Sequence, residues 1–170
     1  VVLAKTTMPD YGMLSSGLSS FHKLSRNPWD LSRTPGGSSA GAGAAAAAGY
    51  GPLHIGTDIG GPLRLPAGWC GIFTLKPSLG RIPIDPPYMG RAAGPMTRTV
   101  EDAALFMDVL SRPDERDSMS LPWQDIAWAG FDAGVDKLRG LRIGLLLEAG
   151  CGLGVEPEVR AAVERARLLF

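Results

Sequence analysis

Two glycine-rich segments, separated by a stretch of small residues, place the tightest limit on how this chain can fold. The first covers residues 35–43 (PGGSSAGAG) and the second covers residues 56–64 (GTDIGGPLR). Glycine loses more backbone freedom on folding than any other residue, so ordered turns this rich in glycine indicate unusual dihedral angles or close main-chain contacts. The serines of the first segment and the run of backbone N–H groups in the second predict a site built from hydroxyl groups and main chain.

Along the 170 residues, the hydrophobic pattern predicts strands that alternate with helices, which is typical of an α/β fold. Thr99 and Asp102 have the spacing of a capping box at the start of an amphipathic helix. Trp69, Phe73 and Leu75 are core candidates in an apolar but irregular stretch. The expected strands are 1–4, 53–57 and 141–147, the expected helices are 40–48, 99–111 and 157–169, and the expected loops are 6–34, 76–98 and 114–140.

Composition narrows the class of function. Lys plus Arg and Asp plus Glu each number 17, so the formal net charge is zero and nothing favours direct contact with nucleic acid or a membrane surface. Two cysteines are too few for a disulfide framework, so we expect a reducing, cytoplasmic setting. We expect no metal and no cofactor.

Two short patterns in the first glycine-rich segment compete as explanations. Residues 37–41 match the G-x-S-x-G nucleophile elbow, and residues 41–46 match the G-x-G-x-x-A fingerprint of dinucleotide-binding proteins, with Asp58 near the spacing of a ribose-binding acid. Both patterns require a strand directly before them, and none is expected there. His54 lies too close in sequence to be the base of an elbow, and we expect a packed core histidine instead.

Read together, GGSSAGAGAAAAAG and GTDIGG-x-x-R-x-P closely resemble the amidase signature family of serine hydrolases. Residues 4–12, 69–78 and 94–98 also resemble segments of that family, so the likeness covers nearly the whole chain. The resemblance implies an α/β fold with a mixed β-sheet flanked by helices on both faces. It also implies hydrolysis of a carbon–nitrogen amide bond through an acyl-enzyme, by a triad of a serine, a second serine and a lysine.

The resemblance assigns roles to particular residues. By motif position Ser38 is the second serine, which follows a cis peptide bond at Gly37–Ser38 and relays protons between the lysine and the nucleophile. Ser39 is the neighbouring hydroxyl that orients the site. The remaining roles are oxyanion donors, which would be the N–H groups of Ile59, Gly60 and Gly61, and a supporting pair, Asp58 with Arg64, for which an ordinary surface ion pair is the alternative.

The sequence departs from the family at the nucleophile and at the base. The family's nucleophilic serine follows GTDIGG, and this chain has Pro62 at that position. Proline has neither a hydroxyl nor an N–H, so we expect the chain as given to be inactive by the family's route. The family's catalytic lysine lies upstream of residues 1–4, and none of the lysines present matches it; these are Lys5, Lys23, Lys76 and Lys137.

The ends of the chain suggest a piece of a larger domain, because it opens on an apolar run without Met and stops within a helical pattern. We expect residues 1–170 to be the central part of a single amidase-like domain, truncated at both ends. A small-molecule amide is the expected substrate, and the sequence leaves open a homo-oligomer or membership of an amidotransferase assembly. The alternatives are a non-catalytic binding or scaffold fragment of the same fold and nucleotide binding at the Gly41 turn.

Three further side chains have expected surroundings. Cys70 lies beside Trp69 in an apolar stretch, which favours an inert buried thiol. Trp123 and Trp128 lie in the expected 114–140 loop, where they line a substrate entrance or pack under the loop.

Overall fold

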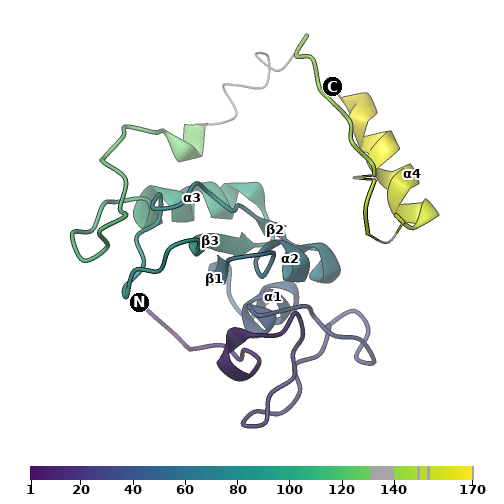
Figure 1. Cartoon of the computed structure of the whole chain (residues 1–170), viewed down its shortest axis with the longest axis horizontal. Coiled ribbons are helices and arrows are strands. Elements are labelled where there is room, and N and C mark those ends of the chain that lie inside the picture. The colour runs from purple at the N-terminus through teal and green to yellow at the C-terminus, as the bar shows by residue number, and fades with distance from the viewer. Residues whose placement is uncertain (131–139, 149, 153, 170) are drawn as a thin grey trace. The chain divides into compact units, whose positions relative to one another are not determined.

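The computed structural model describes residues 1–130, 140–148, 150–152 and 154–169, and the chain divides into two compact units, Val1–Ala129 and Gly130–Phe170 (Figure 1). The first unit holds a small sheet with its helices. The second holds α4 (Pro157–Ala166) and a following 3₁₀ turn, Arg167–Leu169. None of the helices in the described ranges has the length and apolarity needed to cross a bilayer.

The sheet of the first unit has three strands in the order β1-β3-β2. These are β1 (His54–Asp58), β2 (Phe73–Thr74) and β3 (Ala92–Thr97), and both pairs are antiparallel. Every residue of β3 is buried. The central position of β3 between two partners explains this burial.

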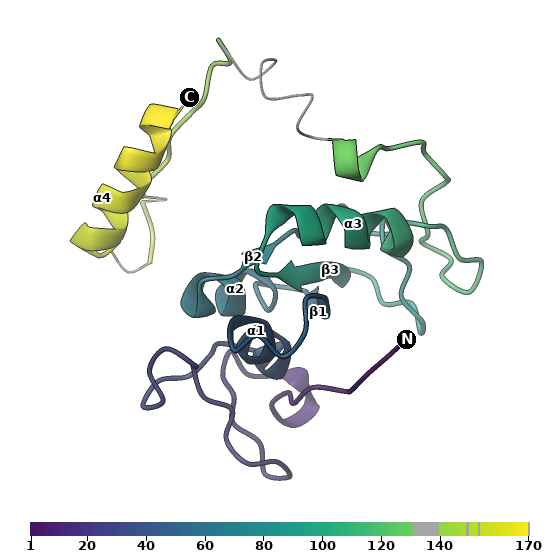
Figure 2. The ribbon, with the colours of Figure 1, turned by 180° about the vertical axis from the view of Figure 1, so that it is seen from behind.

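Helices cover both faces of this sheet. Met96 of β3 packs with Leu63 and with Ala42 of α1 (Ala40–Ala47), whereas Ala93 packs with Met107 of α3 (Val100–Leu110). Positions 93 and 96 differ by an odd number, so their side chains leave opposite faces of the strand. The views in Figures 1 and 2 agree, with α3 on one side of β3 and α1 on the other. The expected α/β fold, a sheet with helices on both faces, is confirmed.

Strand β3 lies within the stretch 76–98, which was expected to be a loop because of its prolines. Pro95 stands opposite Ile55 of β1, and its carbonyl accepts a 2.7 Å hydrogen bond from Thr74 Oγ1 on the β2 side. A residue's nitrogen and carbonyl point to the same side of a strand, so the missing N–H also faces β2. Because β2 ends at Thr74, Pro95 removes no ladder hydrogen bond and a central strand tolerates it.

The stretch 63–75 is also more regular than expected. It contains α2 (Arg64–Cys70), which ends at Gly71 in the left-handed conformation, with φ 66°, and it contains β2. Of the expected core residues, Trp69 is 47% exposed, and Phe73 and Leu75 are half-buried. The helix contains Pro66 and Gly68, which are poor helix formers. For this reason the sequence pattern did not predict a helix here.

The three expected helices are present as α1, α3 and α4. The expected cap of α3 is also present, because Thr99 Oγ1 accepts a 3.0 Å hydrogen bond from the N–H of Asp102. The expected strand 53–57 corresponds to β1.

Two expected strands are not formed. Residues 1–4 and 141–147 have no regular structure, and their apolar side chains are exposed except for half-buried Leu147; Val2 is 87% exposed and Leu146 is 81% exposed. A strand needs a neighbour to pair its backbone groups, and no described strand pairs with either segment. Part of the expected 114–140 loop (residues 131–139) and Phe170, expected on the apolar face of the last helix, lie outside the described residues.

Candidate functional site

Ser38 lies at the start of the small-residue helix, directly before Ser39, the N-cap of α1. The Gly37–Ser38 peptide bond is cis, as the resemblance predicted. Ser38 is half-buried, and a Cβ placed on Gly12 would lie 3.9 Å from its Oγ. The loop at residue 12 therefore borders the hydroxyl that the sequence assigned to proton relay.

Ser39 joins the two glycine-rich segments. Its Oγ accepts a 3.2 Å hydrogen bond from the N–H of Thr57 and donates to the carbonyl of Thr57 at 3.4 Å. This position fits the predicted orienting role. In a nucleophile elbow Ser39 would be the nucleophile, but its hydroxyl is engaged with β1, and residues 31–35 before it form no strand.

Asp58 organises the second segment. Its side chain is fully buried and accepts hydrogen bonds from the N–H groups of Gly61 (2.6 Å) and Leu63 (3.3 Å). Arg64 completes the arrangement with a two-point contact, Nε to Oδ2 at 2.9 Å and Nη2 to Oδ1 at 3.1 Å. Although the Arg64 side chain is 56% exposed, its bidentate contact with a fully buried carboxylate differs from the ordinary surface ion pair that was the alternative.

The electrostatics of Asp58 follow from these contacts. Burial raises the pKa of the carboxyl, but the hydrogen bonds from Arg64, Gly61 and Leu63 outweigh burial and hold the pKa below its ordinary value. The same contacts raise the pKa of Arg64. Asp58 is therefore ionised at neutral pH, and its negative charge fixes the backbone on both sides of Pro62.

The turn between Asp58 and Leu63 carries the expected oxyanion donors. Ile59 and Gly60 are exposed, so their backbone groups lie near solvent. The N–H of Gly61 instead points to Asp58, and Gly61 has φ 133°, which a side chain rarely allows. Pro62 is half-buried and has no N–H. Gly61 was expected to be an oxyanion donor, but its N–H is already committed to the buried carboxylate.

The start of α1 leaves little space for a nucleotide. The N–H of Gly41 donates a 2.9 Å hydrogen bond to the carbonyl of Thr7. A Cβ on Gly41 would overlap the Thr7 backbone nitrogen. Residue 7 therefore occupies the place where a pyrophosphate approaches the glycine turn of a dinucleotide-binding protein, and this weakens the nucleotide interpretation.

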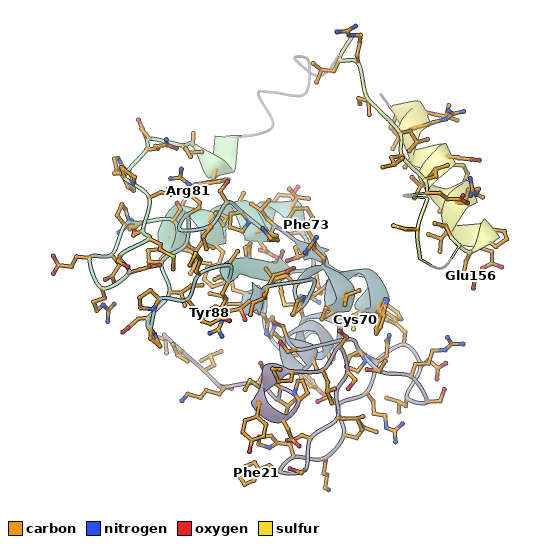
Figure 3. All side chains as sticks on the ribbon, viewed as in Figure 1. Phe21, Cys70, Phe73, Arg81, Tyr88 and Glu156 are labelled. Carbon is orange, nitrogen blue, oxygen red and sulfur yellow. The ribbon has the colours of Figure 1, made fainter. Side chains whose placement is uncertain are left out.

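Cys70 and His54 have the following surroundings. Cys70, in α2 (Figure 3), is fully buried, its Sγ contacts the carbonyl of Pro35 at 3.4 Å, and burial raises the pKa of its thiol, as expected of an inert cysteine. His54 is half-buried rather than in the core, and its ring Nε2 lies 3.3 Å from the carbonyl of Gly51.

The two tryptophans of the 114–140 stretch differ from each other. Trp128 packs partly buried against the Met107 cluster, and its Nε1 donates to Ser111 Oγ at 3.0 Å, so it packs under the loop. Trp123 is 60% exposed. Across the described ranges, no group of three or more His, Cys, Asp or Glu side chains is arranged to hold a metal ion.

The pattern-based reading missed two side chains that support α2. Asn27 Nδ2 donates to the carbonyl of Trp69 at 2.8 Å, and Trp29 Nε1 donates to the carbonyl of Cys70 at 2.7 Å. Both cap carbonyls at the end of a helix whose C-terminal groups lack intrahelical partners. In the sequence, Asn27 and Trp29 are visible only as two residues that precede the first glycine-rich segment. Their capping role could not be predicted, because helix α2 itself was not predicted.

Solved structures and curated relatives resemble this chain along most of its length. It is similar to 6-aminohexanoate cyclic dimer hydrolase, solved with substrate, at 35% identity and a TM-score of 0.85, over 98% of this chain and 36% of the other. It is similar to a bacterial aryl acylamidase of the amidase signature family at 36% identity and a TM-score of 0.80, over 95% of this chain and 34% of the other.

Among curated relatives, a glutamyl-tRNA(Gln) amidotransferase subunit from Desulforapulum autotrophicum is 42% identical over 178 residues, which is 98% of this chain and 35% of that protein. The corresponding protein from Chromohalobacter salexigens is 43% identical over 175 residues, 98% of this chain and 34% of that protein. The chain thus spans about a third of the length of these relatives. The family model described as Amidase matches residues 1–169, and the chain belongs to the amidase signature family.

Proposed function

We propose that this chain forms part of an amide-hydrolase site in which Pro62 stands where the nucleophilic hydroxyl is required, so that it binds an amide without forming an acyl-enzyme. The observation that carries the proposal is the turn around Pro62. Asp58 holds this turn by the N–H groups of Gly61 and Leu63 and by Arg64. The support of a reactive turn is therefore retained while its reactive side chain is absent.

The chemistry explains why position 62 matters. In the family's route a serine oxygen attacks the amide carbonyl carbon, the carbon–nitrogen bond breaks, and the amine leaves with a proton passed through the second serine, here Ser38. Water then hydrolyses the acyl ester. The proline ring has no oxygen to form that ester, and in another serine hydrolase loss of the nucleophile lowers turnover by ~10⁶.

Stabilisation of the tetrahedral intermediate is weakened as well. Pro62 donates no hydrogen bond, and the N–H of Gly61 is directed to Asp58. The donors left in the turn are those of Ile59 and Gly60. Removal of one oxyanion donor lowers turnover by ~10²–10³ in other hydrolases, so the loss at position 62 extends beyond the missing nucleophile.

The codon for residue 62 is first verified by DNA sequencing. The test then compares native full-length protein with its Pro62→Ser form. A serine-directed fluorophosphonate probe should label the Pro62→Ser form alone. The control is Pro62→Ala, which restores an N–H but no hydroxyl and should stay unlabelled. Equal labelling and amide turnover in the native protein would show that the nucleophile lies elsewhere.

A non-catalytic binding module is the second candidate. Two contacts that shape the site are present despite the proline. These are the hydrogen bond between Thr57 and Ser39 and the ion pair between Asp58 and Arg64. Saturable binding of a small amide without turnover would support this candidate, and the absence of binding would leave a scaffold role.

The remaining features of the whole protein are proposals of the same kind. Residues 1–170 would be the central part of a single amidase domain, with the lysine base supplied from outside them. The substrate would be a small-molecule amide in a reducing, cytoplasmic setting. A homo-oligomer or an amidotransferase assembly is a further proposal, and light scattering of the purified full-length protein, alone and with candidate partner proteins, tests it.

A further inference from the structure

A pocket of about 450 Å³ lies beside the C-terminal end of α2 and outside the residues assigned to the amide site. It is lined by Asn27, Arg33, Thr34 and Trp69. Trp69 is 47% exposed, so part of its ring is accessible to a ligand. A volume of this size is typical of small-molecule sites and accommodates one aromatic ring with a polar substituent.

Hydrogen bonds hold the walls of this pocket in place. The N–H of Asn27 donates to the carbonyl of Arg33 at 3.0 Å, and the N–H of Arg33 donates to the carbonyl of Asp30 at 2.9 Å. The buried side chain of Asn27 connects this loop to α2, because its Nδ2 donates to the carbonyl of Trp69 at 2.8 Å. Since both walls are fixed before a ligand arrives, binding requires little ordering of the protein.

The polar groups in the lining are suited to donate hydrogen bonds. Within the described ranges, the Arg33 side chain makes one hydrogen bond, from Nε to Asp30 Oδ2 at 3.0 Å, so both Nη groups keep their donors. Thr34 Oγ1 accepts from the N–H groups of Gly17 and Gly36, at 3.3 and 3.2 Å, and its O–H remains a donor. A guanidinium with a neighbouring hydroxyl favours an anion, and its planar fork matches a carboxylate.

Asp30 orients the guanidinium of Arg33. Its Oδ1 accepts from the N–H and the Oγ of Ser32, at 2.9 and 2.6 Å, while its Oδ2 accepts from Arg33 Nε. The carboxylate of Asp30 is therefore occupied on both oxygens. Because only Nε of Arg33 is used, the end of the guanidinium that carries both Nη groups can bind a second carboxylate.

From this arrangement we propose that the pocket binds an aromatic carboxylate. The carboxylate accepts from the Nη groups of Arg33 and from the hydroxyl of Thr34, and the ring lies against Trp69. An indole gains more from an aromatic ring, by offset or edge-to-face packing, than from a saturated ring of the same size. The pocket therefore favours benzoate over cyclohexanecarboxylate, and over benzyl alcohol, which has the ring without the charge.

The experiment measures the dissociation constants of these three compounds by titration calorimetry, in full-length protein with its native Pro62. Arg33→Gln removes the cation and Trp69→Leu removes the ring, whereas Trp69→Phe keeps an aromatic face. Arg112→Gln and Trp123→Leu are the matched controls, because Arg112 is an exposed arginine and Trp123 a 60% exposed tryptophan elsewhere in the chain. The bond from Asn27 to the carbonyl of residue 69 involves main chain there, so the substitutions at Trp69 retain it.

We expect benzoate to bind saturably, with a dissociation constant below ~10 mM. Arg33→Gln should weaken it by about tenfold. Trp69→Leu should weaken it by about three- to tenfold and leave cyclohexanecarboxylate unchanged, while Trp69→Phe and both controls keep the native preference.

The absence of saturable benzoate binding would overturn the inference. A benzoate affinity that survives Arg33→Gln or Trp69→Leu would also overturn it, because the ligand then binds elsewhere, including at the amide site. An equal loss in Arg112→Gln or Trp123→Leu would do the same, since neither control residue lines the pocket.

Discussion

Helices α3 and α4 have similar sequence signals and different surroundings. Each combines an apolar stripe with at least one acidic residue in its first turn, and both were expected from the hydrophobic pattern alone. Helix α3 buries Ala103, Ala104 and Met107 against the sheet, whereas no described residue of α4 is buried. The comparison teaches that an amphipathic period predicts a helix, while burial depends on a complementary surface in the same structure.

Two acid–arginine pairs repeat this contrast. Asp58 is fully buried while its partner Arg64 is 56% exposed, whereas Arg160 and Glu148, paired in the second unit, are both exposed, at 37% and 56%. An exposed pair competes with water and contributes little, but a buried carboxylate without its partners is costly. We therefore expect substitutions in α3 and at Asp58 to lower the free energy of unfolding more than matched substitutions in α4 and at Glu148.

The largest effect is expected from Asp58→Ala. It leaves two buried N–H groups without an acceptor and Arg64 without its partner, and we expect a loss of about 3–5 kcal/mol in the free energy of unfolding. Urea denaturation of full-length protein measures it. Glu148→Ala is the matched control, and its effect should stay below about 1 kcal/mol. Similar losses in both variants would contradict the contrast.

Met107→Ala should be next in size. Met107 is fully buried in the cluster with Ile82 and Ala93, so its truncation creates a cavity and should cost about 2–5 kcal/mol. Val163 of α4 is 40% exposed, and Val163→Ala should change stability by less than about 0.5 kcal/mol. A large loss for Val163→Ala would reveal a partner surface for α4 in the full-length protein.

The helix caps provide a smaller test. Thr99 accepts a hydrogen bond from the N–H of Asp102, whereas Glu156, the N-cap of α4, makes no side-chain capping bond. Thr99→Ala should cost about 1 kcal/mol, and Glu156→Ala should be close to neutral. Thermal unfolding followed by circular dichroism measures both, and equal shifts would show that the Thr99 bond adds nothing.

The smallest effect on stability is expected at Asp114, which is half-buried in the first unit. Hydrogen bonds from Arg116 lower the pKa of its carboxyl to about 2. A lowered native pKa stabilises the fold above the unfolded value near 4, and this stabilisation is lost as pH falls toward 2. Carbon-13 NMR titration should find the midpoint near 2 and, in Arg116→Gln, a midpoint raised toward the ordinary value, because the variant loses the guanidinium but keeps the N–H of residue 116. An unchanged midpoint would exclude the contact in solution.

The sequence by itself determined the features that depend on local spacing. Helices α1, α3 and α4 and the Thr99 cap were all expected from residues close in the chain, and the cis bond at Gly37–Ser38 was expected from the motif that contains it. The family followed from the two glycine-rich segments, because a site made of main chain and small hydroxyl residues leaves a dense motif. The same motif identified Pro62 as the residue that replaces the family's nucleophilic serine.

Tertiary structure decided what depends on partners far apart in sequence. Strand β3 forms around Pro95 because β1 lies on one side and β2 ends before the missing N–H is needed. Residues 1–4 and 141–147 are apolar enough for strands but have no described strand beside them. The N–H of Gly61 turns to Asp58 because burial of that carboxylate demands donors. The periodicity of a segment shows which side chains can share one face. Whether that face is buried, and which groups its backbone pairs with, depends on residues far away in the sequence.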